Sequence, residues 1–239
     1  MNQHTEPNDS VLQNYQRFLH HSVAMIGGFL GAYAILVRSN FFGNAQTANL
    51  IYIIFAIFGR DFWSFLCRVG IFVLYFGSGV VYVLIQNKTS WNTQKIALWL
   101  DAIMIVILGF LPSDMDSMLA LYPIFICMSF QWNAFSGVYG YASSTIFSSN
   151  NVRQVSLAIG EYLCNKDKKH LHKAFFFIGS LIGFHLGVAS GYLAVMHLGL
   201  RAVWMGLFHV ALSACILKKC SSYKNCNYSG QLPKTYKNT

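Results

Sequence analysis

Uncharged polar side chains interrupt long apolar sequence at two places in this chain of 239 residues. The first interruption contains Asn44, Gln46, Thr47 and Asn49, with apolar sequence on both sides. Unpaired backbone N–H and C=O groups cost several kcal/mol each in hydrocarbon, so a polar break at membrane depth must line a cavity or be buried in protein. We therefore expect a binding site here.

The second interruption, Ser136–Asn151, repeats this pattern, because Ser149, Asn150 and Asn151 stand 102 residues after Thr47, Ala48 and Asn49. Thr47 and Ser149 are predicted to be helix N-caps, and free N–H groups at helix starts favour an anionic group. We expect the two breaks to face each other across a polar cavity that binds a small polar or anionic solute. The alternative is that these side chains only cap and join broken helices.

Asp101 is the clearest carboxylate inside an apolar segment. A buried charge at a helix centre costs about 2.5–3.5 kcal/mol or more, so we expect Asp101 to pair or to titrate. Arg68 is its predicted partner. Three roles stay open here, namely coupling of a proton to transport, anchoring of the substrate, and a purely structural ion pair.

Composition indicates an integral membrane protein. Hydrophobic residues make up 55% of the chain and charged residues only 10%, against roughly 25% charged in a soluble domain. The apolar runs are too long for barrel strands, so the fold class is all-α. We assign the net charge of +9 to loops on the cytoplasmic side rather than to nucleic-acid binding. The polar N-terminus predicts no cleaved signal peptide.

The apolar pattern predicts about six full spans and two partial helices in one membrane domain over residues 21–218. A polar tail covers residues 1–20, with a short interfacial helix around 11–19, and a basic tail covers 219–239. Both tails are predicted to be cytoplasmic because Lys and Arg concentrate in the segments on that side. The predicted spans are 22–37, 64–85, 95–111, 118–135, 174–195 and 200–217, and the partial helices are 50–58 and 152–163.

The order of elements repeats, with halves at about 21–111 and 118–217. Each half has a span, a polar break, a short helix, a glycine-rich span and a further span. Three full spans per half make the halves inverted in the membrane, and four make them parallel. Six spans agree better with the charge bias, because eight would move Lys88 and Lys95 outside, but eight remain open.

The stretch GGFLGAYAILVRSNFFGNAQTANL resembles the N-terminal signature of the YoaK-like family of small bacterial membrane proteins, which contains a Gln-Thr-Gly-Asn motif. A weaker second motif corresponds to SNNVR at 149–153, and the resemblance covers roughly residues 15–220. Ala48 stands where the family has a glycine, and Ser149-Asn150 stands for Thr-Gly. The resemblance implies a permease-like protein of unknown function in the bacterial cytoplasmic membrane.

Catalytic motifs are absent from the sequence, and we predict no enzyme, cofactor or metal site. Glycines recur every fourth residue between Gly179 and Gly191, which predicts close helix packing within the monomer, with a homodimer as the second interpretation. The predicted function is a small secondary transporter in contact with membrane lipid. The alternatives are a structural or regulatory membrane subunit and a membrane-embedded enzyme.

Overall fold

The computed structural model describes residues 7–38, 42–44 and 46–222, and these are almost entirely helical. A two-stranded antiparallel hairpin within the second polar interruption contains the only β-strands among the described residues. The elements in chain order are α1 (Pro7–Val37), α2 (Thr47–Phe58), α3 (Phe62–Lys88), α4 (Thr93–Phe110), α5 (Ser117–Ala120), α6 (Tyr122–Ala134), β1 (Gly137–Val138), β2 (Tyr141–Ala142), α7 (Ser149–Asn165), α8 (Lys168–Leu198), the 3₁₀ helix η1 (Gly199–Met205) and α9 (Gly206–Ser222).

Four helical segments are long and apolar enough to cross a membrane, so the architecture is that of an all-α membrane protein. Three are single helices, and the fourth is the run Lys168–Ser222, which contains α8, η1 and α9. The sequence separated an interfacial helix around residues 11–19 from a first span, and that separation is wrong because α1 continues unbroken to Val37. The expected span 118–135 is divided at Leu121 into α5 and α6, and Pro123 lies in the first turn of α6.

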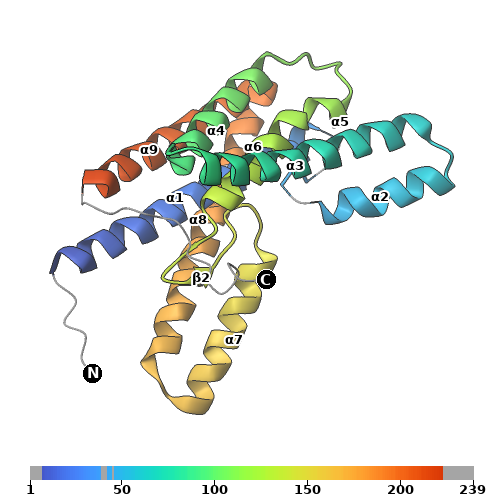
Figure 1. The fold of residues 1–239 in the computed structure, drawn as a ribbon. Helices are drawn as coiled ribbons and strands as arrows, with labels where there is room; N and C mark the ends of the chain where they lie inside the picture. The colour runs from blue at the N-terminus through green and yellow to red at the C-terminus, as the bar shows by residue number, and fades with distance from the viewer. Residues whose placement is uncertain (1–6, 39–41, 45, 223–239) are drawn as a thin grey trace.

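Glycines bring α1 and α8 into close contact at the centre of the molecule (Figure 1). A Cβ atom added at Gly183 or Gly187 would collide with the backbone carbonyls of His21 or Met25 on α1. On the other helix, Gly28 lies against the backbone of Phe184. The predicted glycine ladder therefore packs within the monomer, and α1 occupies the surface it forms.

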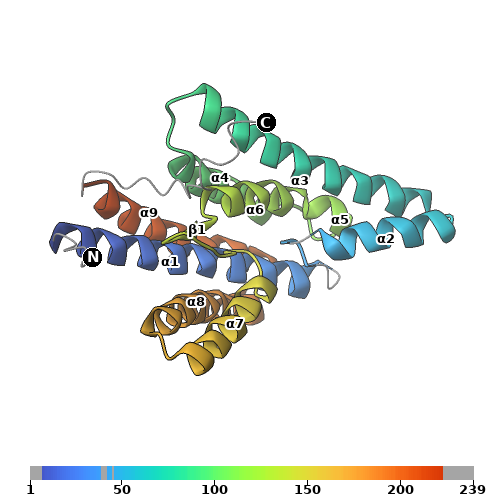
Figure 2. The same ribbon diagram turned by 60° about the horizontal axis from the view of Figure 1, so that its bottom comes forward.

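The remaining helices follow a regular pattern of neighbours. Helix α6 packs against α3 and α4, while α1 packs against α8 and α9. The short helices α2 and α7 fold back on α3 and α8, and the two resulting hairpins project in different directions (Figures 1 and 2). The two polar interruptions lie where these hairpins join the centre.

The outer surface is apolar, as expected for helices that face lipid. Helix α3 exposes Phe62, Trp63, Phe72, Val73 and Phe76 to between 39% and 70% of their full area. A contiguous apolar surface of this kind marks a membrane or protein contact. The buried core lies mainly along α1, α6 and the facing side of α4.

Candidate functional site

The first polar interruption lies between α1 and α2 in the chain, and amide side chains are its main polar groups. Helix α2 begins at Thr47 with Gln46 as its N-cap, and the Gln46 side chain accepts no hydrogen bond from a backbone N–H of the helix. The prediction that Thr47 caps this helix is therefore wrong by one position. Because Gln46 does not cap the helix, its amide is available to side chains that pack beside it.

Asn49 is fully buried between α2 and α3. Its Nδ2 donates to Gln46 Oε1 and to the backbone carbonyl of Arg68, each at 3.0 Å. Asn49 Oδ1 and Gln46 Nε2 are buried as well but have no hydrogen-bond partner among the described residues. Both predicted residues therefore direct polar atoms into the interior that the described chain does not satisfy.

Asn44 connects the two interruptions. Its Nδ2 donates to the carbonyl of Gly27 on α1 at 2.6 Å and to the carbonyl of Ile146 in the second interruption at 2.9 Å. Nearby on α6, Gln131 Nε2 donates to Thr145 Oγ1 at 3.1 Å. The side-chain oxygens of Asn44 and Gln131 are buried without a partner in the part of the chain that the structure describes. We call Asn44, Gln131 and Thr145 the central amide cluster.

The second interruption hydrogen-bonds its asparagines, and Ser148 Oγ is its one buried side-chain polar atom without a partner among the described residues. Asn151 Oδ1 accepts from Ser143 Oγ at 3.0 Å and from the backbone N–H of Ser144 at 3.1 Å, while its Nδ2 donates to the carbonyl of Ser144 at 2.7 Å. Asn150 Nδ2 donates to the carbonyl of Ala142 at 3.2 Å. Ser149 is exposed as the first residue of α7, so its predicted capping role is wrong, and Ser148 occupies the N-cap position.

The structure does not join the two predicted groups into one cluster. Asn49 and Asn151 are not hydrogen-bonded to each other and share no partner in the described chain. The views in Figures 1 and 2 agree that α2 and α7 lie on different sides of the molecule. The contact between the interruptions is made by Asn44 and Ile146 instead.

A buried polar network that the sequence did not indicate surrounds Ser143. His20 Nε2 lies 2.9 Å from Ser143 Oγ, and Ser180 Oγ lies 3.4 Å from the same hydroxyl. All three residues are at most 2% exposed. His20 was assigned to the polar tail, and it is 123 residues from Ser143 in sequence, so no local signal could have identified the pair.

Asp101 and Arg68 do not form the predicted pair. Asp101 is fully buried on α4, faces the Cys127 thiol of α6, and has no hydrogen-bond donor for either oxygen among the described residues. The Cys127 thiol instead donates to the carbonyl of Ile124 at 3.4 Å. Arg68 Nε donates to Ser64 Oγ at 3.0 Å, and its guanidinium lies 4.5 Å from the centroid of the Tyr52 ring.

Both projecting hairpins have a left-handed residue directly before an aspartate. Arg60 between α2 and α3, and Lys166 between α7 and α8, both have φ of 55°. Each is followed by an aspartate N-cap, so that Asp61 accepts from the N–H of Ser64 and Asp167 from the N–H of Lys169. Hydrogen bonds from the Lys169 ammonium and N–H group lower the pKa of Asp167.

No group of three or more His, Cys, Asp or Glu side chains that could hold a metal ion occurs in the described part of the chain. Residues 19–216 match the family described as "Protein of unknown function (DUF1275)". No curated protein and no solved structure matches the chain.

Proposed function

We propose that this chain, which belongs to the DUF1275 family of proteins of unknown function, is a small secondary transporter for a small polar or anionic solute. The observation that carries the proposal is a set of buried amide atoms without partners among the described residues. These atoms are Asn44 Oδ1, Gln46 Nε2, Asn49 Oδ1 and Gln131 Oε1. The first three belong to the first interruption. Gln131 lies on α6 and donates to Thr145, next to the Ile146 carbonyl that Asn44 contacts.

Such atoms need an explanation, because an unsatisfied buried donor or acceptor costs about 1–3 kcal/mol. Asn151 shows that the same chain can provide partners for both polar atoms of an equivalent amide. A polar solute that enters the first interruption would supply donors and acceptors to the unsatisfied atoms. We therefore place the solute site at Asn44, Gln46 and Asn49, and we assign to Ser149, Asn150 and Asn151 a supporting role.

The first interruption begins at a buried cation, Arg38, and a positive charge favours an anion. Arg38, at the end of α1, is 1% exposed, and it donates from two nitrogens to the carbonyl of Pro112 at 3.2 Å. It forms no ion pair with a carboxylate among the residues that the structure describes. A guanidinium is a permanent cation, and its charge stabilises an anionic group that comes close to it.

Asp101 is the residue that we assign to ion coupling. Cys127 faces Asp101, and Gln131 follows Cys127 by four residues, so both lie on one face of α6. This face connects Asp101 with the central amide cluster. A carboxylate without hydrogen-bond donors is stabilised by a proton or a small cation, which is the ligand that a secondary transporter couples to its solute.

The neighbours of the helices support the proposed internal repeat. If α1, α2, α3 and α4 correspond to α6, α7, α8 and α9, the contact of α1 with α8 corresponds to that of α6 with α3. The contact of α1 with α9 corresponds likewise to that of α4 with α6. The matching turns at Arg60 and Lys166 fit the same scheme. We propose six spans, formed by α1, α3, α4, α5 with α6, α8 and α9, in inverted halves.

The remaining expectations form part of the same proposal. YoaK belongs to the matched family, and we propose that this chain shares the permease-like role that the resemblance implies. We place the protein in the bacterial cytoplasmic membrane with both termini inside, because the basic segments favour that orientation. The chemistry assigned to the site is binding and release without covalent steps, so we propose neither an enzyme nor a cofactor.

A structural subunit is the second candidate, favoured by the complete hydrogen bonding of Asn151. Flux assays in proteoliposomes distinguish the two functions. The solutes are radiolabelled amino acids, small carboxylates and inorganic anions, measured with and without a pH gradient. The variants are Asn49→Ala, Asp101→Asn and the control Asn87→Ala, whose amide donates to the Val83 carbonyl on the exposed side of α3.

Transport predicts protein-dependent flux of at least one solute, about tenfold lower in Asn49→Ala, which corresponds to one lost polar contact. Asp101→Asn should abolish the effect of the pH gradient, while Asn87→Ala should behave as wild type. Circular dichroism and gel filtration would show that each variant is folded. Absence of flux for every solute, or equal flux in Asn49→Ala, would refute transport through this site.

A further inference from the structure

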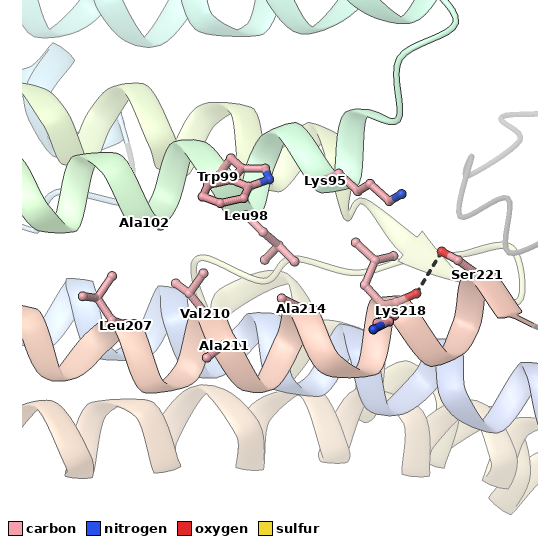
Figure 3. A pocket seen from close by; sticks show the side chains of 11 residues that line it. Lys95, Leu98, Trp99, Ala102, Leu207, Val210, Ala211, Ala214, Lys218 and Ser221 are labelled. Atoms are coloured by element: carbon pink, nitrogen blue, oxygen red, sulfur yellow. Dashed lines mark hydrogen bonds between the residues drawn. The ribbon is translucent and has the colours of Figure 1, made fainter.

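An elongated groove lies between α4 and α9 on the outside of the molecule (Figure 3). Its volume is about 600 Å³, within the range of small-molecule sites, and it opens to the side. The walls are apolar, and the small side chains of Ala211 and Ala214 on α9 leave the space between the helices. The lining residues are Lys95, Leu98, Trp99, Ala102, Leu207, Val210, Ala211, Ala214, Leu217, Lys218 and Ser221.

The charged groups of the groove gather at one end. The two helices run in opposite directions, so Lys95 near the start of α4 and Lys218 near the end of α9 lie together (Figure 3). Both lysines are exposed, and neither forms an ion pair with a carboxylate among the described residues. The groove therefore has a long apolar part, which we call the trough, and a positively charged end.

The length of the trough matches one leaflet of a bilayer. From Leu207 to Lys218, α9 rises about 16 Å at about 1.5 Å per residue. Half of a hydrocarbon core of about 30 Å is about 15 Å. Long basic side chains extend to reach water, so we place the two lysines at headgroup level. The apolar part of the groove then extends to about the bilayer centre.

We propose that this groove is a binding site for an anionic phospholipid. One acyl chain lies between α4 and α9, and the phosphate group lies between the ammonium groups of Lys95 and Lys218. Trp99, which is 68% exposed, covers the chain beside the headgroup. Basic residues between membrane helices are known as a recognition mode for acidic lipid headgroups.

The combination of features selects a lipid over other occupants. A water-soluble solute would need polar groups along the groove, but here they lie at the lysine end. The opening faces sideways between two apolar helices, which is the direction from which a lipid enters. This inference does not depend on the transport proposal, because the groove shares no residue with the amide site.

Native mass spectrometry of the purified full-length protein in mild detergent tests the proposal. The probes are dioleoyl phosphatidylglycerol, which is anionic, and dioleoyl phosphatidylcholine, which has no net charge. The double variant Lys95→Gln with Lys218→Gln removes the charges, and Ala214→Trp fills the trough without changing the charge. The control Lys88→Gln removes an exposed lysine at the end of α3 that does not line the groove.

We expect one phosphatidylglycerol per protein, retained about equally by wild type and Lys88→Gln. The double variant should bind it about twenty-five-fold more weakly, because each lysine beside an anionic lipid contributes about a factor of five. Ala214→Trp should lose the lipid as well. The proposal would be overturned if both lipids were retained equally, or if the double variant and Ala214→Trp bound phosphatidylglycerol as wild type does. A protein dimer in place of the lipid adduct would overturn it as well.

Discussion

The two polar interruptions occupy corresponding places in the chain but are opposite in their hydrogen bonding. Asn151, in the second interruption, makes three hydrogen bonds to Ser143 and Ser144. Asn49, its counterpart in the first, leaves its carbonyl oxygen without a partner among the described residues. Equivalent amides can thus either stabilise a fold or present polar atoms to a ligand, and the neighbouring side chains decide which.

Alanine substitution of Asn151 and of Asn49, one at a time, is the strongest test of this difference between the interruptions. Asn151→Ala should lower the free energy of unfolding by about 2–3 kcal/mol, because three buried hydrogen bonds are lost at about 1 kcal/mol each. Asn49→Ala should cost only about 1 kcal/mol, because the loss of two hydrogen bonds is partly offset by removal of the unsatisfied buried oxygen. Thermal unfolding of both variants in detergent measures the difference, and equal losses would contradict the distinction between the interruptions.

Two glycines of α1 allow a second comparison. A Cβ atom at Gly27 would collide with the backbone of Thr145 in the second interruption, whereas at Gly31 it would meet the side chains of Phe42 and Asn44 at 2.8 and 3.0 Å. Gly27→Ala should therefore destabilise the protein by about 2 kcal/mol. Gly31→Ala should cost less than about 1 kcal/mol, because side chains move more easily than backbone.

Gly31→Ala should still change solute flux, because it displaces Asn44 in the central amide cluster. Thermal unfolding and proteoliposome flux of the same two preparations provide the measurements. A more stable Gly27→Ala than Gly31→Ala protein would show that the second interruption is the less rigid of the two.

The smallest expected effect concerns the hairpin turns. Arg60 and Lys166 both adopt a left-handed backbone that glycine adopts without steric cost. Arg60→Gly and Lys166→Gly should each raise the free energy of unfolding by about 0.5 kcal/mol. Glycine relieves the backbone strain of the folded state, and this gain exceeds the entropy that glycine adds to the unfolded chain. Unfolding midpoints measure both changes. The control is Asn87→Gly, which should destabilise the protein because Asn87 lies within the right-handed helix α3.

If one glycine variant raised the free energy of unfolding and the other lowered it, the two turns would not be equivalent. That result would weaken the proposed internal repeat, which depends on the correspondence of α2 and α3 with α7 and α8.

Local patterns predicted much of the helical structure. The partial helix expected at 50–58 is α2, and the one expected at 152–163 is α7, each extended by a few residues. The same patterns failed at the N-terminal part of α1, where polar side chains suggested an interfacial segment apart from the first span. Tertiary packing of α1 against α8 and α9 stabilises a continuous helix there.

The site was predicted only in part. Asn44, Gln46 and Asn49 stood out because polar residues between apolar runs are costly in a membrane. The contacts of Asp101 with Cys127 and of His20 with Ser143 join residues far apart in the chain, and no spacing rule connects them.

By itself, the sequence determined that this is a helical membrane protein with two polar interruptions, because hydrophobicity and helix signals act over short stretches of chain. Only the tertiary structure decided which amides are satisfied and that Arg68 does not pair with Asp101. Hydrogen bonding of a buried group depends on the position of atoms brought together by packing, and that position is a property of the whole fold.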